Sequence, residues 1–210
     1  MTASNGPPGG SIGVRLTGTG GGTTVVVPPR VGVTPGACQI DVAVTSDTPG
    51  TLPNSTTGVT ANVGVIVTGN PSNVANLTVN AAAPVIVKAF LTPSIPVGGV
   101  SRMRFTITNP NSIPLTGMSF TDGLTNMQLA NPPNVGGTCT GVSSTATAGA
   151  TSFTVTSGDL AGGGSCTVEV DVTSTSVSAG PGWANYASGV TTTQTPVAGS
   201  QSNTDRKSVV

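Results

Sequence analysis

Hydrophobic and polar residues alternate along several short stretches of the chain. In SRMRFTITN, residues 101–109, the apolar positions are Met103, Phe105 and Ile107, and Arg or Thr stands between them. In CTVEVDVT the apolar row is Cys166, Val168, Val170 and Val172, opposite Thr167, Glu169, Asp171 and Thr173. Successive side chains of a β-strand point to opposite faces of its sheet, so this period of two predicts strands with one buried and one solvated face.

Turn-forming segments separate these stretches at short intervals. They include NPNSIP at 109–114, TDGL at 121–124, NPPNVGG at 131–137 and SGDLAGGGS at 157–165. Gly, Pro, Asn and Asp supply the backbone conformations that tight turns need. Short half-buried strands between such turns, without a helical period of useful length, predict an all-β fold built as an antiparallel β-sandwich.

One phrase occurs twice. GACQIDVAVTS at 36–46 returns as GSCTVEVDVTS at 164–174, and residues 23–46 align with 151–174 without a gap. Further matches hold the same order, SIGV at 11–14 with CTGV at 139–142 and NSTTGVT at 54–60 with NYASGVT at 185–191. This spacing predicts two tandem copies of one domain.

The two copies differ in their front halves. Residues 84–135 belong to the front of the second copy, and too few residues precede Ser11 for the first copy to contain an equivalent. We therefore expect a first repeat at 1–83, truncated at its N-terminal side, and a nearly complete second repeat at 84–210. The first repeat also has no aromatic residue, which predicts a thin core and unpaired strand edges that favour self-association.

Composition limits the partners. The 210 residues include 7% charged and 3% aromatic side chains, no His, and seven charges of each sign. A chain with 36% hydrophobic residues and no net charge is expected to fold, and it lacks the basic clusters that bind nucleic acid or anionic lipid. Its apolar runs are too short for membrane insertion, and MTASNGPPGGSIG at the start does not have the pattern of a signal peptide.

Several segments of the second copy resemble a known family. VKAFLTPSIPVGGVSRMRFTITNPNSIPLTGMSFTDGL at 87–124, a later CTG, and LAGGGSCTVEVDVTS at 160–174 are similar to the bacterial conserved-repeat domain. The resemblance runs from about Pro84 to Thr204 and over the back part of the first copy. It implies two immunoglobulin-like sandwiches in tandem on a secreted or surface protein, and it implies no enzymatic activity.

The three cysteines have different expected states. Cys139 and Cys166 stand 27 residues apart on two predicted strands, and Cys166 lies in an inward row, so we expect a disulfide between them. Two buried free thiols are the alternative. The position that matches Cys139 in the first copy is Ser11, so Cys38 is expected to be a buried free thiol.

The C-terminal residues DRKSVV, 205–210, hold three of the fourteen charged side chains. Codons that encode them, GAT CGG AAG AGC GTC GTG, also spell the start of a common sequencing adapter. A non-native tail on a gene fragment would account for these residues, the truncated front and the missing signal peptide. An ordinary polar C-terminal tail is the alternative.

Candidate chemistry is sparse. Without His, a Ser/His/Asp or Cys/His group is excluded, and a Ser-Lys pair would have to use Lys88 or Lys207. We expect neither a cofactor nor a metal site, because the cysteines are widely spaced and Asp122 in TDGL is a lone calcium candidate. Trp183 and Tyr186 are candidates for a sugar-binding platform, but a lone Trp in a sandwich of this size suits a core better. The carboxylates available for glycosidic cleavage are Asp41, Asp47, Asp122, Asp159, Glu169, Asp171 and Asp205.

Three functions fit these observations, and none is enzymatic. The first is a structural spacer or stalk repeat of a large, exported bacterial surface or secreted protein, adhesin-like proteins included, whose partners are neighbouring repeats. The second is a filament subunit that assembles by strand donation through its incomplete sandwich. The third is a carbohydrate-binding accessory module, which the scarcity of aromatic residues disfavours.

Overall fold

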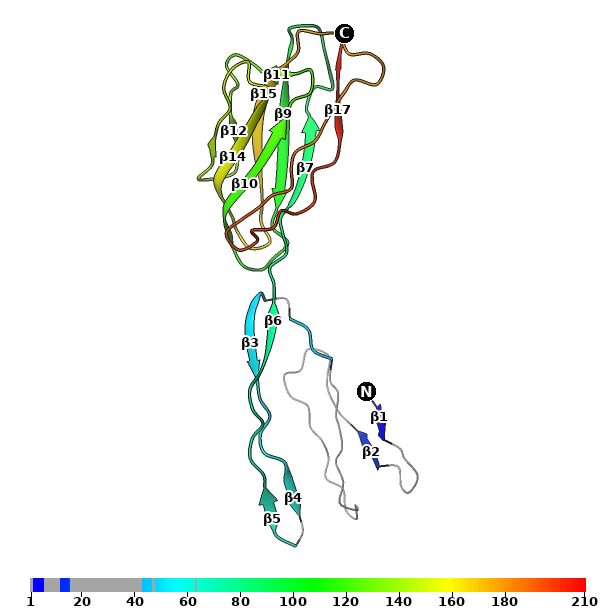
Figure 1. Cartoon of the computed structure of the whole chain (residues 1–210), viewed down its shortest axis with the longest axis vertical. Helices are drawn as coiled ribbons and strands as arrows, with labels where there is room; N and C mark the ends of the chain where they lie inside the picture. The colour runs from blue at the N-terminus through cyan, green and yellow to red at the C-terminus, as the bar shows by residue number, and fades with distance from the viewer. Residues whose placement is uncertain (1, 6–11, 16–42, 47, 63) are drawn as a thin grey trace. The chain divides into compact units, whose positions relative to one another are not determined.

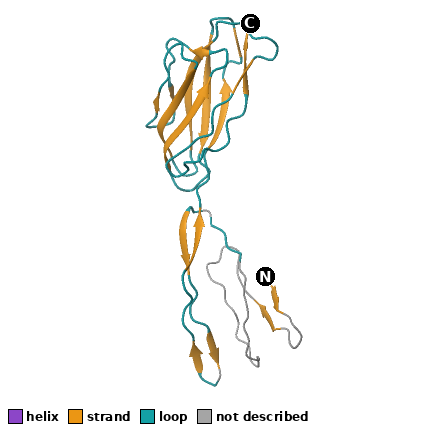
Figure 2. Ribbon diagram, viewed as in Figure 1, coloured by secondary structure: helices purple, strands orange, loops and turns teal. Residues whose placement is uncertain are grey.

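A computed structural model describes residues 2–5, 12–15, 43–46, 48–62 and 64–210 of the chain (Figure 1). The chain divides into two compact units, one formed by residues 1–45 and 53–76 and the other by residues 46–52 and 77–210. All regular secondary structure in the described residues is β-strand (Figure 2).

The first unit contains short two-stranded pairings. Strands β1 (Thr2–Asn5) and β2 (Ile12–Arg15) form one antiparallel hairpin, and β4 (Thr60–Asn62) and β5 (Ile66–Thr68) form another. Strand β3 (Gly50–Asn54) pairs with β6 (Ala75–Val79), and the division between the units falls within both of these strands. Residues 16–42, with Cys38 and residues 36–42 of the first copy of the repeated phrase, lie outside the described residues. The two-copy interpretation and its boundary at residue 83 therefore stay predictions.

The second unit is a β-sandwich. Its larger sheet has the order β11-β15-β9-β7, with β12 also on β15, and the opposite sheet has the order β10-β14-β13. The strands of the larger sheet are β7 (Val85–Phe90), β9 (Val100–Thr108), β11 (Gln128–Leu129), β12 (Gly136–Gly137) and β15 (Ser165–Thr173). Those of the opposite sheet are β10 (Leu115–Gly123), β13 (Ser143–Ser144) and β14 (Ser152–Leu160).

A third, smaller sheet completes this unit. Strand β16 (Trp183–Asn185) pairs antiparallel with β17 (Asp205–Val209), and β17 pairs in parallel with β8 (Ser94–Ile95). Val209 and Lys207 of β17 are fully buried. Residues 205–209 therefore form a strand of this unit, and the interpretation of DRKSVV as a non-native tail stays a prediction.

The core lies where the inward rows of the two large sheets meet. Met103, Phe105 and Ile107 of β9 and the valines of β15 are fully buried, as the alternation predicted. The Phe105 ring centroid lies 5.1 Å from that of Phe120 and 5.9 Å from that of Phe153, which joins the sheets through aromatic contacts. The predicted all-β sandwich is thus confirmed for this unit.

Candidate functional site

The carboxylates of β15 lie on the outer side of the larger sheet, where the side chains of Glu169 and Asp171 are only 15% and 13% exposed. Arg102 Nε lies 2.7 Å from Glu169 Oε2, and Arg102 Nη1 lies 2.9 Å from Asp171 Oδ1. Arg104 Nε lies 2.6 Å from Glu169 Oε1. Hydrogen bonds from Arg102 and Arg104 lower the pKa of Glu169. A carboxylate held ionised in this way is poorly suited to act as the acid of glycosidic cleavage, and the cluster instead cross-links strands β9 and β15.

The interior of the sandwich contains a lysine. Strand β7 places Ile86, Lys88 and Phe90 inward, while Val85 and Val87 point outward and are about half exposed. Lys88 is only 2% exposed, and its Nζ lies 5.3 Å from the ring centroid of Phe90 and 5.4 Å from that of Phe105. The π-faces of aromatic rings attract a cation and exclude water from it.

Asp122 of β10 faces this lysine from the opposite sheet. Lys88 Nζ donates hydrogen bonds to Asp122 Oδ1 at 3.0 Å and to Oδ2 at 3.2 Å, and neither side chain has exposed surface. Burial lowers the pKa of Lys88 to about 8 and raises that of Asp122 to about 6, although each charge partly offsets the other's shift. The free-energy difference between the ionised pair and the pair with a neutral amine and a protonated carboxyl group is therefore much smaller in this dry interior than in water.

Asn185 completes the group from strand β16. It is 2% exposed, its Nδ2 donates to the backbone oxygen of Gly123 at 2.5 Å, and its side chain also hydrogen-bonds Asp122. Its Oδ1 is buried without a hydrogen-bond partner. Buried amide oxygens are nearly always paired, so this atom needs a physical explanation. Lys88, Asp122 and Asn185 form what we call the buried triad.

Signals for the triad exist in the sequence, but sequence reasoning missed their connection. Lys88 stands in the inward row of VIVKAF with Ile86 and Phe90, and Asp122 continues the buried row of Phe120 at a spacing of two. A charged side chain at an inward position is stable only with a buried partner of opposite charge, because its desolvation is otherwise too costly. The structure pairs Lys88 with Asp122, so the carboxylate that was considered for calcium is engaged by an ammonium.

Trp183 and Tyr186 lie near the triad in the sequence but do not act together. Trp183 is partly buried and packs against the core cluster, as expected from its being the lone Trp, whereas Tyr186 is 53% exposed. A sugar platform needs aromatic faces presented together to solvent. This pair does not offer one.

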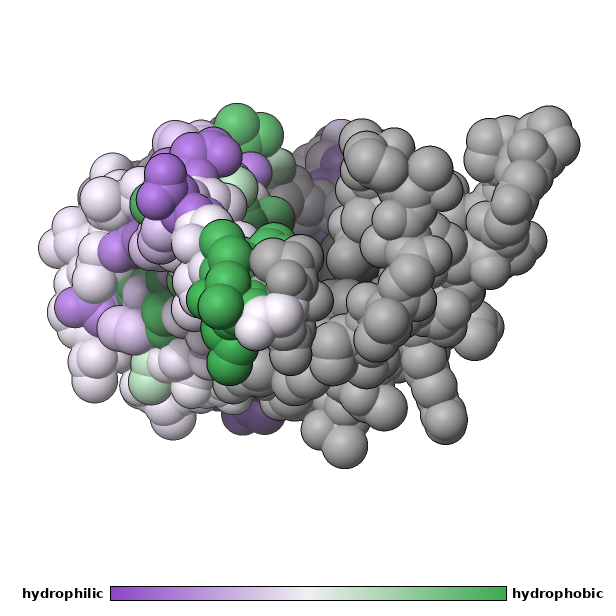
Figure 3. Space-filling model, turned by 90° about the horizontal axis from the view of Figure 1, so that it is seen from below, coloured by the Kyte–Doolittle hydropathy of each residue, from purple (hydrophilic) through white to green (hydrophobic). Residues whose placement is uncertain are grey.

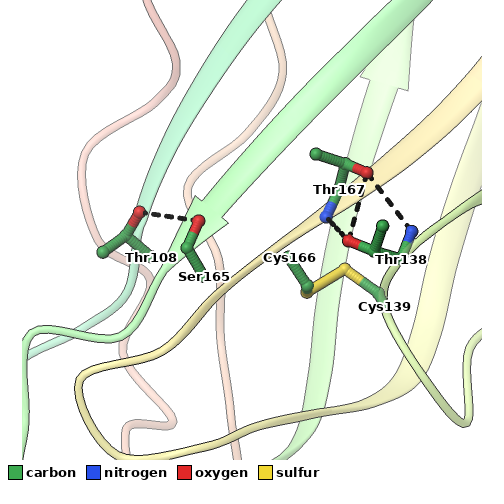
Figure 4. Close-up of a disulfide and its surroundings, with 6 residues drawn as sticks. All are labelled: Thr108, Thr138, Cys139, Ser165, Cys166 and Thr167. Atoms are coloured by element: carbon green, nitrogen blue, oxygen red, sulfur yellow. Dashed lines mark hydrogen bonds between the residues drawn. A yellow bond between two sulfur atoms is a disulfide. The ribbon is translucent and has the colours of Figure 1, made fainter.

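Cys139 and Cys166 form a disulfide, with their Cα atoms 4.8 Å apart (Figure 4). Thr138 and Thr167 hold the two segments together beside it, since Thr167 N donates to Thr138 Oγ1 at 2.9 Å and Thr138 N donates to Thr167 O at 2.9 Å. Gly137 has φ +122°, and a Cβ there would lie 2.1 Å from Thr167 O. The close approach of this segment to β15 thus requires glycine beside the bridge.

The remaining candidate features carry no chemistry. A pocket of about 480 Å³ is lined by small or uncharged residues that include Ser46, Asn80 and Asn111. The described residues contain no cluster of three or more His, Cys, Asp or Glu side chains arranged to hold a metal ion. Within the same residues no helix is long and apolar enough to cross a membrane. Asp41 and Asp47 lie outside them.

Comparison with solved structures finds similar chains of low identity. The full-length major pilin SpaD from Corynebacterium diphtheriae is 14% identical, with a TM-score of 0.40 over 58% of this chain and 34% of the pilin. A cohesin module from a family 33 glycoside hydrolase of Clostridium perfringens is 9% identical, with a TM-score of 0.39 over 60% of this chain and 96% of the module. The chain thus spans about a third of the pilin's length.

Comparison at the sequence level gives the family. No curated protein matches the chain. The family described as "Domain of unknown function (DUF7933)" matches residues 84–205, which is more than half of the chain and covers the sandwich from β7 to the start of β17. The chain therefore belongs to this family of domains of unknown function, DUF7933.

Proposed function

We propose that the protein is a non-catalytic structural module, a spacer or stalk segment of a large bacterial surface or secreted protein. One observation carries this proposal, namely that the distinctive polar groups of the sandwich connect its own strands. The disulfide joins β15 to the segment after β12, the buried triad joins three sheets, and the outer charges join β9 to β15. Polar groups used in this way stabilise the domain against unfolding. Since they are engaged with one another, few reactive side chains remain to act on a substrate.

The disulfide supports a location outside the cytosol. Disulfides persist in oxidising compartments and are rare where thiols are kept reduced. The polar, Thr-rich surface and the balanced charge suit a module that stands in solvent without binding nucleic acid or lipid. We extend the family assignment to a relation with the bacterial conserved-repeat domain and to a tandem arrangement, on the motifs at 87–124 and 160–174.

The solution mass of the full chain tests this proposal. A spacer is expected to sediment as a monomer across a wide range of concentrations, with one cooperative unfolding transition for the sandwich. A concentration-dependent ladder of oligomers would contradict the spacer function. It would favour assembly between chains instead.

A second candidate function, a subunit that assembles through strand edges, is favoured by the surface of the first unit. The β4–β5 hairpin and the residues beside it expose Val59 at 81%, Val65 at 67%, Ile66 at 74% and Val67 at 51%. In Figure 3, apolar residues, coloured green, gather in a patch near the middle of the view. Short two-stranded hairpins with exposed apolar side chains offer edges to which another strand can add.

A surface substitution separates the two candidates. Ile66→Lys places a charge on the exposed hairpin without changing the sandwich, and Thr175→Lys, at another exposed position, is the matched control. If the protein assembles through this hairpin, Ile66→Lys reduces the oligomers and Thr175→Lys does not. If the chain is a monomeric spacer, both variants sediment as monomers, like the wild type.

A further inference from the structure

The buried triad has a composition and a setting that a purely structural ion pair does not require. An amine, a carboxyl group and a carboxamide converge from β7, β10 and β16 in a space bounded by the rings of Phe90 and Phe105. The Asp122 carboxylate contacts both of the other groups. The three side chains belong to three different sheets, so the folded domain alone brings them together.

We propose that Lys88 Nζ and Asn185 Cγ become joined by an intramolecular isopeptide bond, with Asp122 as the acid and base that promotes the reaction. The inference goes beyond the proposed function. It concerns a covalent bond within one domain, whether or not that domain is a spacer.

The reaction needs a neutral amine and a protonated carboxyl group. Burial moves the pKa of Lys88 down to about 8 and that of Asp122 up to about 6, so moving the shared proton from lysine to aspartate is far easier here than in water. A desolvated lysine is an effective nucleophile. A protonated Asp122 could donate a hydrogen bond to Asn185 Oδ1, the buried oxygen that otherwise has no partner.

The steps balance without a redox partner. The lone pair of Lys88 Nζ attacks Asn185 Cγ and a C–N bond forms, while Asp122 gives its proton to the oxygen of the tetrahedral intermediate. The Asp122 carboxylate then takes one proton from Nζ and passes it to Nδ2. When the Cγ–Nδ2 bond breaks, the carbonyl re-forms, the proton on its oxygen returns to Asp122, and ammonia leaves. One amine and one carboxamide give one secondary amide and one ammonia, and Asp122 returns to its starting state.

Proximity supplies much of the rate. Amines attack unactivated carboxamides very slowly in water, but fixed orientation of two reacting groups is equivalent to a very high local concentration. The Gly123 carbonyl holds Asn185 Nδ2, and the Asp122 carboxylate holds Lys88 Nζ. Asn203 does not compete in this geometry, because its side chain is engaged by the backbone N–H and C=O of Lys88.

Intact mass of the full chain under reducing conditions tests the proposal. We expect the wild-type mass to be lower than that of the sequence by one ammonia, and peptide mapping to find residues 88 and 185 in one branched peptide. Lys88→Met, Asn185→Ala and Asp122→Ala should keep the full mass, whereas the matched control Asn203→Ala should retain the deficit. Circular dichroism of each variant confirms that it is folded.

The controls separate the alternatives. Full mass in the folded wild-type chain would overturn the proposal. So would a deficit that persists in Lys88→Met, because a succinimide at an asparagine also loses ammonia but needs no lysine. Should Asp122→Ala fail to fold, Asn185→Ala and the branched peptide still decide the outcome, since they need no change at Asp122.

Discussion

The ammonium of Lys88 and the carboxylate of Asp122 meet between the two sheets of the sandwich, 3.0 Å apart and without exposed surface. One lies on β7 and the other on β10, 34 residues later in the chain. A buried charge is tolerated only when a partner offsets its desolvation, so each of these residues explains the presence of the other.

Removing one partner of this pair should be far more costly than removing both. In an Asn185→Ala background, which cannot form the isopeptide bond, Asp122→Ala is expected to lower the free energy of unfolding by about 3 to 5 kcal/mol, because Lys88 stays buried without a counter-charge. Adding Lys88→Met should recover much of that loss. Urea unfolding of the three variants measures both effects, and strictly additive losses would show that the two charges are independent.

The rate of isopeptide formation should depend on pH in a bell shape. The reactive form of the pair carries one shared proton, a state that predominates between the pKa of Asp122, about 6, and that of Lys88, about 8. Below this window the amine is protonated while the carboxyl group is also protonated, and above it the carboxyl group has no proton to donate. Asp205, which raises the pKa of Lys88, and Lys207, near the Phe90 ring, are further charged groups at this site.

Mass spectrometry at timed intervals measures this profile. Chain recovered unfolded from inclusion bodies is refolded by dilution at each pH, and Trp183 fluorescence reports folding separately from the loss of ammonia. A rate that rises steadily up to pH 10 would indicate that amine deprotonation alone limits the reaction. Asp122 would then have no role as an acid.

The disulfide should stabilise the sandwich by closing a loop in the unfolded chain. For the 27-residue separation of Cys139 and Cys166, the chain-entropy estimate is about 3.5 kcal/mol. We expect Cys139→Ser to lower the urea midpoint clearly, and Cys38→Ser, the control at the cysteine predicted to be free, to have a much smaller effect. Equal losses in the two variants would contradict the different states assigned to these cysteines.

Much of the sandwich can be predicted from the sequence because the alternation of apolar and polar residues within each strand is enough to identify the strand. The alternation around Phe105 and Val168 indicates which side of each strand is buried, so no information on the neighbouring strands is needed. The Cys139–Cys166 bridge followed from the same inward row and a simple spacing. Features that depend on one strand's position relative to its neighbours were harder to see.

The buried triad and strand β17 belong to that harder class. Nothing local to Lys88 or Asn185 says which residue faces it across the sandwich, so the contact appears only after the sheets are assembled. Residues 205–207 stand out by their charge, which favours an exposed segment, yet pairing of β17 with β16 and β8 buries Lys207 and Val209. Local charge is a poor guide to burial where long-range pairing decides it.

Glycine at position 137 should be required for the segment that carries Cys139. Gly137→Ala combines an unfavourable φ of +122° with a Cβ only 2.1 Å from Thr167 O, so the segment must move away from β15. Gly149→Ala is a matched control with φ +78° and open space around its Cβ. We expect the control to lose about 1 kcal/mol of stability and Gly137→Ala to lose clearly more. Equal losses would mean that conformation alone, without close packing on β15, selects this glycine.

The isopeptide bond should also change how the domain responds to force. Residue 88 lies near the start of the family domain at 84–205 and residue 185 lies 20 residues before its end, so a bond between them carries tension directly and shields the 96 residues of chain between them. At about 3.5 Å per extended residue, that segment corresponds to about 340 Å of contour length. When the full chain is pulled from its ends under reducing conditions, the Asn185→Ala variant should release this length on unfolding and the wild type should not. Equal extension of the two chains would show that no bond spans these residues and that the triad holds the sheets by charge and hydrogen bonding alone.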